Sequence, residues 1–284
     1  MNKVVIFADS TIDLNPEDYK KYDIHVIPLL VSQEGNVYKD GVDIFSDELF
    51  AVVDRTGQLP KTSAESPGTF IESYRPWIEK DYDIVFVGIG EKLSATVTSS
   101  KLAAAELGED RIFTINSNNL SSASGILAMK CCKLRDEGKS AEQIYNEVQK
   151  MAPKLVAMFA VETLDYLYKG GRCSGTARLI GKMLHIHPVI KVVDGTLIVY
   201  KKPRGKMQKA INEQVFELKH DLPNVDTDHI MITYSGVTPE IKKYFFETIS
   251  KYVDPSSIHL SRTGCVISSH CGYGTIGLLY LKTK

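Results

Sequence analysis

Residues 84–96 read Ile-Val-Phe-Val-Gly-Ile-Gly-Glu-Lys-Leu-Ser-Ala-Thr, and this stretch decides the fold class. The apolar run is typical of a strand buried on both faces, and it ends in two glycines. Ser94 then precedes an Ala-rich segment that we predict to be a helix running through Leu107-Gly108. A strand, a glycine-containing turn and a helix in this order favour a parallel sheet covered by helices.

The same alternation of strand and helix fills the first half of the chain. We expect further strands at 4–8, 24–31 and 111–115. Helices should begin at Asn15-Pro16, Ser46 and Ser66-Pro67, and two more should flank Gly138-Lys139-Ser140. These elements predict a parallel sheet flanked by helices in an N-terminal α/β domain, residues 1–155.

The second half has a different pattern of predicted strands and helices, and we assign residues 156–284 to a C-terminal α/β domain with a mixed or antiparallel sheet. Asp194-Gly195 between apolar runs predicts a type I′ hairpin. Residues 163–186 have a helical and loop-like pattern. The remaining expectations are strands at 155–161, 230–234, 257–261 and 278–282 and helices at 207–220 and 238–253.

Composition narrows the function classes. The formal net charge is −1 and no basic tract occurs, which argues against a nucleic-acid partner. The apolar N-terminal run is too short for a signal peptide or a membrane span, so we expect a soluble cytoplasmic protein without stable membrane insertion. Five irregularly spaced cysteines do not suggest a disulfide framework. Cys265, His270 and Cys271 fit no familiar zinc pattern, so no metal is expected.

Polar clusters follow the predicted strands at the edge where open parallel sheets bind ligands. Three of them are Asp9-Ser10-Thr11, residues 88–94 and Asn116-Ser117, and a fourth, Lys61–Pro67, leads into a helix. A single Ser or Thr at such a place is most often only a helix cap. Four clusters near one sheet edge favour a binding site, and Ser94 at a helix N-terminus suits an anion.

His270 ends a second apolar run and is followed by Gly272 and Gly274. This pattern predicts a strand that ends by presenting an imidazole on a sharply bending loop. A hydrogen-bonded structural histidine is the alternative interpretation. If the His270 loop meets the Ser94 loop, a hydroxyl and an imidazole face one small ligand.

At these residues the sequence resembles the DegV family of bacterial fatty-acid-binding proteins, nearly from end to end. Each matching motif is weak alone, but five in the same order are a strong resemblance. They are Asp9-Ser10-Thr11-x-Asp13-Leu14, Lys61-Thr62-Ser63, Leu93-Ser94-Ala95-Thr96, Leu164–Arg172 with its Gly-Gly-Arg end, and His270-Cys271-Gly272-Tyr273-Gly274.

The resemblance implies two α/β domains with a long-chain fatty acid, such as palmitate, in a buried tunnel between them. It implies that Thr62 and Ser94 hydrogen-bond the carboxylate and that His270 lies nearby. Further lining residues would be Ser10, Ser63, Thr96, Ser117 and Ser121. Such a protein is a lipid carrier that needs no cofactor, and it presents the acid to a separate fatty acid kinase. Arg172 and Arg204 would help to dock that kinase, or they are only solvated surface residues.

The chain departs from the family pattern at three places. The Thr-Ser loop is longer and carries Glu65, and Cys271 and Tyr273 replace a threonine and a proline. Ala95 replaces a glycine, so the backbone there should avoid positive φ. Chain length preference would depend on tunnel side chains such as Ile27, Met158 or Phe159.

Two other functions fit the same residues. A hydrolase or acyl transferase would use Ser94 or Ser10 as nucleophile and His270 as base, and it requires a third group that orients the imidazole. A lipid-sensing regulatory protein would bind the same ligand and signal to another protein.

Overall fold

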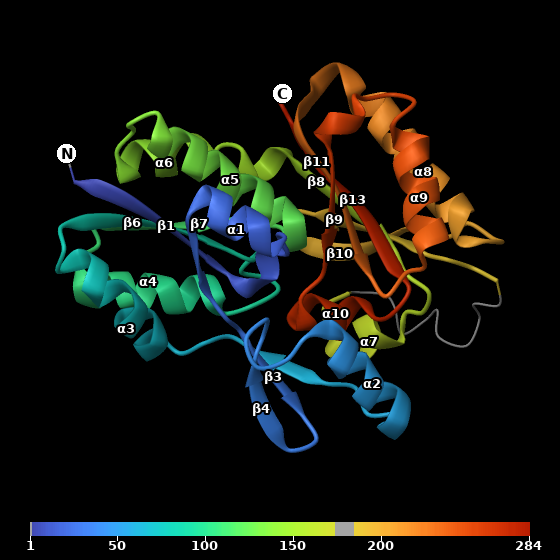
Figure 1. The fold of residues 1–284 in the computed structure, drawn as a ribbon, viewed down its shortest axis with the longest axis horizontal. Helices are drawn as coiled ribbons and strands as arrows, with labels where there is room; N and C mark the ends of the chain where they lie inside the picture. Colours follow the sequence, from blue (N-terminus) through green and yellow to red (C-terminus); the bar gives the residue numbers. More distant parts are fainter. Residues whose placement is uncertain (1, 174–184) are drawn as a thin grey trace.

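The structure is a computed structural model that describes residues 2–173 and 185–284. Its strands form a four-stranded, a six-stranded and a three-stranded sheet (Figure 1). Part of the segment predicted to be helical and loop-like, 174–184, lies outside the described residues. The expected α/β fold with one parallel and one mixed sheet is confirmed.

The four-stranded sheet has the order β2-β1-β6-β7 and is parallel throughout. Its side chains alternate between two cores, since Val5 and Phe7 of β1 point to one face and Ile6 and Ala8 to the other. Helices cover both faces, with α3 and α4 on one side and α5 and α6 on the other (Figure 1). The strands are β1 (Lys3–Asp9), β2 (Ile24–Ile27), β6 (Tyr82–Gly88) and β7 (Ile112–Asn116).

Three helices of the first half begin or end at residues that the sequence marks as helix caps. Asn15 caps α1, Gly57 ends α2 at φ 68°, and Ser140 and Gln143 form a capping box on α6. The bounds are α1 (Pro16–Tyr22), α2 (Ser46–Thr56), α3 (Pro67–Ile78), α4 (Thr96–Leu107), α5 (Ser121–Asp136) and α6 (Ala141–Val148).

The single strand predicted at 24–31 is wrong, because the segment divides at Pro28 between two sheets. Pro28 has no N–H to continue the parallel ladder, so β2 stops and β3 (Leu30–Gln33) begins a separate antiparallel sheet. Its partners are β4 (Asn36–Lys39) and β5 (Lys61–Ser63). We did not predict β4 or β5, since each is too short to show a periodic pattern. Val31 of β3 pairs with Thr62 of β5, so this sheet positions a predicted site residue.

The six-stranded sheet comes from the second half of the chain and has the order β10-β9-β8-β13-β11-β12. The β9–β10 hairpin closes at Asp194-Gly195 with positive φ at both residues, as its turn residues predict. β11 and β13 extend further than their apolar cores suggested. The strands are β8 (Leu155–Ala160), β9 (Val189–Val193), β10 (Thr196–Lys201), β11 (Val225–Ser235), β12 (Ile258–Arg262) and β13 (Thr275–Lys282).

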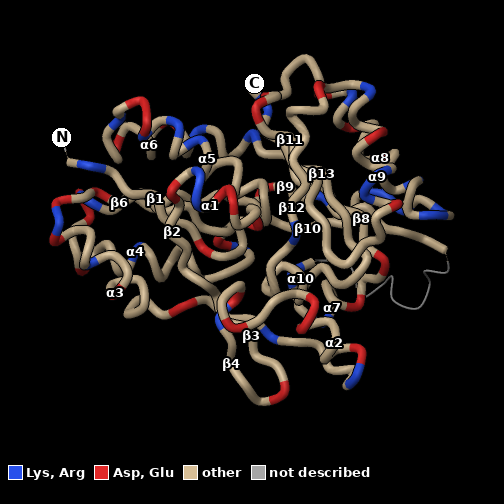
Figure 2. The backbone as a smooth tube through the Cα atoms, viewed as in Figure 1, with Lys and Arg blue, Asp and Glu red and all other residues tan. Residues whose placement is uncertain are grey.

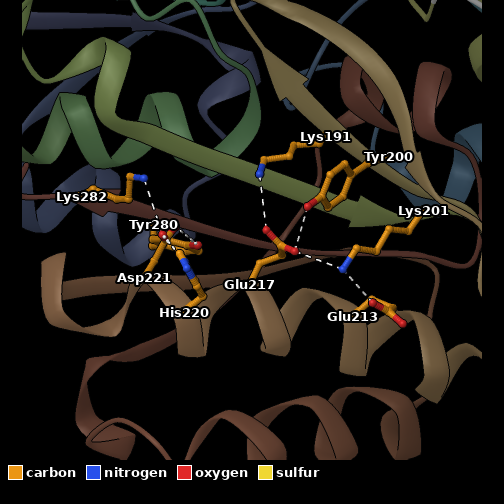
Figure 3. Close-up of polar contacts among 9 residues, drawn as sticks. All are labelled: Lys191, Tyr200, Lys201, Glu213, Glu217, His220, Asp221, Tyr280 and Lys282. Carbon is orange, nitrogen blue, oxygen red and sulfur yellow. Dashed lines mark hydrogen bonds and ion pairs between the residues drawn. The ribbon is translucent and has the colours of Figure 1, made fainter.

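Helix α8 (Met207–Asp221) lies with α9 (Pro239–Ile249) on the outer face of this sheet. Polar contacts fix α8 at two places (Figure 3). Glu217 accepts hydrogen bonds from Tyr200 and Lys201 of β10 at 2.8 and 3.1 Å, and Tyr280 of β13 donates to Asp221 at 2.9 Å. These contacts anchor the edge and the middle of the sheet to one helix.

Helix α5 lies between the two larger sheets, and every residue from Ser121 to Cys132 is buried. One apolar core includes Ile126 and Leu127 of α5, Ile6 of β1 and Leu279 of β13. The hydrophobic interior is therefore continuous across the two halves. The division into domains at residue 155 remains a prediction, although β8 begins there.

Along the described backbone, positions of Lys and Arg are interspersed with positions of Asp and Glu (Figure 2). Within residues 2–173 and 185–284, no helix is long and apolar enough to cross a bilayer.

Replacing Gly125 by Ala should destabilise the fold. A Cβ there would lie 2.7 Å from the Ile12 carbonyl oxygen and 2.8 Å from Leu14 Cδ2, so helix α5 must move. Overpacking of this kind costs about 1–3 kcal/mol, measured as the free energy of unfolding in urea.

Gly68→Ala in α3 is the matched control. Its Cβ would meet only Ser66 Oγ, at 3.5 Å, so this change should be neutral or slightly stabilising. Equal effects of the two substitutions would contradict the tight packing of α5.

Candidate functional site

The segment that carries His270 is a helix, so the predicted strand ending at His270 is wrong. Residues Cys265–Cys271 form α10, which ends at Gly272. The segment is buried on almost all sides, and a short apolar run of that kind has no periodicity that separates strand from helix. The helix begins where the N–H groups of Gly264 and Cys265 donate to Asp13 and Asp40, at 2.7 and 2.6 Å.

His270 meets Thr62, as a site shared by both halves requires. Its Nε2 lies 2.7 Å from Thr62 Oγ1, across 208 residues of sequence. Nδ1 is buried without a hydrogen-bond partner among the described residues. It lies against Gly170, at the end of α7 (Asp165–Gly170), and a Cβ at that position would overlap with it. The imidazole is therefore held between Thr62 and a glycine that leaves room for it.

Burial, together with a smaller effect of the positive charge of Arg172, lowers the pKa of His270 to about 4. The imidazole is consequently neutral near pH 7. One of its nitrogens carries a proton and the other accepts, so it can donate one hydrogen bond or receive one at Thr62.

Ser94 lies on the loop that leads from β6 into α4, next to the helix N-terminus. Its hydroxyl is 2.8 Å from Thr96 Oγ1 and accepts weakly from the Thr96 N–H at 3.4 Å. Ala95 has φ −76°, so the backbone avoids positive φ at the position where the family pattern has a glycine.

Thr62, Ser94 and His270 line one cavity of about 190 Å³, which we call the outer cavity. A smaller inner cavity, of about 50 Å³, continues from it. The two share the lining residues Leu120, Leu197, Ile267 and His270. The inner cavity is walled mainly by apolar groups, including Phe159, Leu167 and Leu279. A polar mouth thus leads into an apolar interior between α5, α10 and the six-stranded sheet.

The other predicted lining residues divide into two groups. Ser63 lines the outer cavity and Ser121 the inner one. Ser10, Thr96 and Ser117 lie outside both linings, and their hydroxyls bond to Asp40, Ser94 and the Asn119 backbone. The serines at the strand ends mostly satisfy local backbone and carboxylate groups, as the capping alternative anticipates.

Of the residues predicted to shape the tunnel or to dock a kinase, some border the cavities and others do not. Phe159 lines the inner cavity. Met158 instead packs in the core between the six-stranded sheet and α8, and Ile27 packs with α3 and α4. Arg172 borders the outer cavity and donates to the Gly170 carbonyl at 2.7 Å. Arg204 is exposed on the chain that follows β10.

Sequence reasoning missed Asp13 and Asp40 as contributors to this site. The Asp13 and Asp40 carboxylates have no metal-loop spacing, so their positions in the sequence suggest no ligand role. It also missed Gly170, whose role depends on an imidazole that approaches from far along the chain. The first motif, Asp9-Ser10-Thr11-x-Asp13-Leu14, was the available signal for Asp13, since it carries two acidic residues directly after an apolar run.

The geometry lacks the arrangement of a catalytic triad. The hydroxyl bonded to His270 is that of Thr62, and Nδ1 has no carboxylate or carbonyl partner within the described part of the chain. The Ser10 hydroxyl donates to the Asp40 carboxylate and accepts from the Leu29 N–H, so it does not hydrogen-bond to His270. A Ser/His hydrolase would need an orienting group on the face that Gly170 covers.

The fold is an α/β fold that combines a parallel and a mixed sheet and has a cavity lined from both halves of the chain. Residues 3–283 match the family described as "uncharacterised protein, DegV family". A DegV domain-containing protein of Clostridium acetobutylicum is 32% identical over 284 residues, covering 99% of each chain. The chain therefore belongs to the DegV family.

Solved structures of similar proteins extend the comparison. A fatty-acid-binding DegV family protein of Thermus thermophilus superposes with a TM-score of 0.90 at 28% identity, covering 99% of this chain and 100% of that one. A DegV lipid-binding protein of Thermotoga maritima gives 0.87 at 28% identity, with 99% of both chains covered. A stearic-acid-binding protein of Eubacterium ventriosum gives 0.85 at 26% identity, with 100% and 99% covered.

The neutral state of His270 predicts a specific acid sensitivity. Its folded pKa, about 4, is depressed below the usual 6.5, so stability is lost as the pH falls from about 6.5 towards 4. His270→Gln removes the titrating group and should reduce the loss of unfolding free energy between pH 7 and pH 4.5 by up to about 2 kcal/mol.

His220→Gln serves as the control, because the His220 side chain is 85% exposed. It should leave the difference between the two pH values unchanged. If His270→Gln is as acid-sensitive as the wild type, the imidazole is not held neutral by burial.

Proposed function

We propose that this protein binds one long-chain fatty acid, such as palmitate, as a lipid carrier. The observation that carries the proposal is the polar mouth made by Thr62, Ser94 and His270, which opens into an apolar cavity. The related proteins described as binding fatty or stearic acid share the fold over the full chain. The proposal includes no metal or cofactor and places the protein in the cytoplasm.

The head-group site, Thr62, Ser94 and His270, would bind the carboxylate through hydroxyl donors. A threonine hydroxyl has one proton, and it can reach the ligand only if His270 Nε2 donates to Thr62 Oγ1. The neutral imidazole allows this arrangement, since it leaves Nδ1 unprotonated beside Gly170. His270 would therefore orient the Thr62 hydroxyl towards the carboxylate. A buried carboxylate without such donors would be costly.

The acyl chain would run along the shared lining residues into the inner cavity and supply most of the affinity. Burial of a dozen methylenes gives a gross transfer free energy of about 10 kcal/mol. A hydroxyl–carboxylate hydrogen bond adds about 1.5–3 kcal/mol. The tail thus sets affinity, and the head-group site sets polarity and orientation.

The bound acid would be transported and presented to a separate fatty acid kinase, which activates the carboxylate. Arg172 supports this proposal because it is exposed at the border of the outer cavity, near the head-group site. Arg204 would extend the docking surface. The protein would not catalyse a reaction by itself.

Thr62→Ala combined with Ser94→Ala should weaken retention of a long-chain fatty acid. Loss of two hydroxyl–carboxylate bonds raises the dissociation constant by about 100-fold or more. Native mass spectrometry of the purified protein, followed by titration with palmitate, measures the occupancy and the affinity.

The control is Thr248→Ala with Ser250→Ala at the C-terminal end of α9, where both hydroxyls donate to backbone carbonyls, at 2.6 and 2.7 Å. It should retain lipid as the wild type does. Unchanged occupancy in the Thr62/Ser94 variant would remove the head-group assignment, and a wild type that binds no fatty acid would remove the proposed function.

A further inference from the structure

We propose that three buried aspartates, Asp9, Asp13 and Asp40, are positioning residues that hold the segments carrying Ser94, His270 and Thr62 in one arrangement. We call them the aspartate cluster. The inference rests on the proposed function for its binding consequence, but its structural part concerns the ligand-free protein. All three side chains come from the first half of the chain, and each is at most 2% exposed.

Two members of the cluster hold α10 by its first turn. Asp13 accepts from the Gly264 N–H at 2.7 Å and Asp40 from the Cys265 N–H at 2.6 Å. Carboxylates are favourable at this end of a helix, where N–H groups lack partners inside the helix. The opposite end of α10 carries His270, so these two bonds set the position from which the imidazole reaches Thr62.

Asp40 also reaches the sheet that carries Thr62. Its second oxygen accepts from Ser10 Oγ at 2.9 Å, and Ser10 Oγ accepts from the Leu29 N–H at 3.1 Å. The Asp40 N–H donates in turn to the Leu29 carbonyl at 2.9 Å. Leu29 directly precedes β3, which pairs with β5 and so with Thr62. One carboxylate therefore links the helix of His270 to the sheet of Thr62.

Asp9 holds the third segment. It accepts from the Ile89 N–H at 2.8 Å, at the start of the loop that delivers Ser94. Its other oxygen accepts from the Thr11 N–H at 3.0 Å, which keeps the turn after β1 next to that loop. Asp9 thus ties the Ser94 loop to the segment that also contains Asp13.

Keeping three carboxylates together in the interior is unfavourable, which argues for a role that apolar residues could not fill. Burial, with added repulsion from Asp40, raises the pKa of Asp9 to about 6. Burial and the neighbouring carboxylates also raise the pKa of Asp13 well above its usual value. Each side chain offsets this cost by accepting a backbone hydrogen bond from a segment that carries a binding residue: the start of α10 for Asp13 and Asp40, and the Ser94 loop for Asp9.

The test measures the position of His270 and the retention of a fatty acid together. Asp40→Ala should shift the imidazole nitrogen resonances of His270 in the ligand-free protein and speed the dissociation of cis-parinaric acid, a fluorescent fatty acid, by about tenfold or more. Asp40→Asn should restore both towards wild type, because its amide oxygen still accepts from the Cys265 N–H. Asp47→Asn is the control, since Asp47 also joins the two halves, through Arg262, but lies on the surface.

A double-mutant cycle with His270→Ala distinguishes positioning from general stability. If Asp40 acts through His270, the double variant releases the probe no faster than the faster single variant. Additive effects, or His270 resonances unchanged by Asp40→Ala, would overturn the inference. If Asp40→Ala does not fold, Asp13→Ala, which removes the other carboxylate that accepts at the start of α10, takes its place in the cycle with the same criterion. A wild type that fails to bind the probe contradicts the proposed function, and the His270 resonances then decide the positioning role alone.

Discussion

The site depends on a short helix, α10, that is held at both ends by residues from the other half of the chain. Asp13 and Asp40 accept the N–H groups at its start, and Thr62 contacts His270 near its end. A helix of this length has little stability of its own, so its position is set by these contacts and by burial. Residues of α10, of α5 and of the six-stranded sheet line the inner cavity, so its shape depends on where α10 is held.

Much of the parallel sheet could be predicted from local patterns. The run at 84–88 and the helix after Ser94 follow directly from apolar residues, glycines and caps. Positions where long-range contacts decide the structure could not be predicted in this way. Residues 265–271 are buried on nearly all sides although they include Ser268, Ser269 and His270, and carboxylates far along the chain accept the N–H groups where this helix begins. At Pro28, by contrast, the sequence itself contains the residue that ends β2, although we predicted one continuous strand there.

The candidate site also divides into what local motifs predict and what only long-range contacts decide. Thr62, Ser94 and His270 were named from motifs, and all three border the same cavity. Ser10 and Ser117 belong to similar polar clusters, yet their hydroxyls bond within the protein. No sequence pattern separates a hydroxyl that faces a cavity from one that satisfies a buried carboxylate or backbone group. That difference depends on which partners the tertiary fold brings near.

Helix α5 has a consequence for how a ligand would enter and leave. Because it is buried from Ser121 to Cys132 and shares one core with both large sheets, swinging the halves apart would expose that core to water. Such a hinge motion would be far more costly than shifting a few side chains around the mouth. Exchange of a bound molecule should therefore resemble threading through a narrow opening more than the opening of a clamshell.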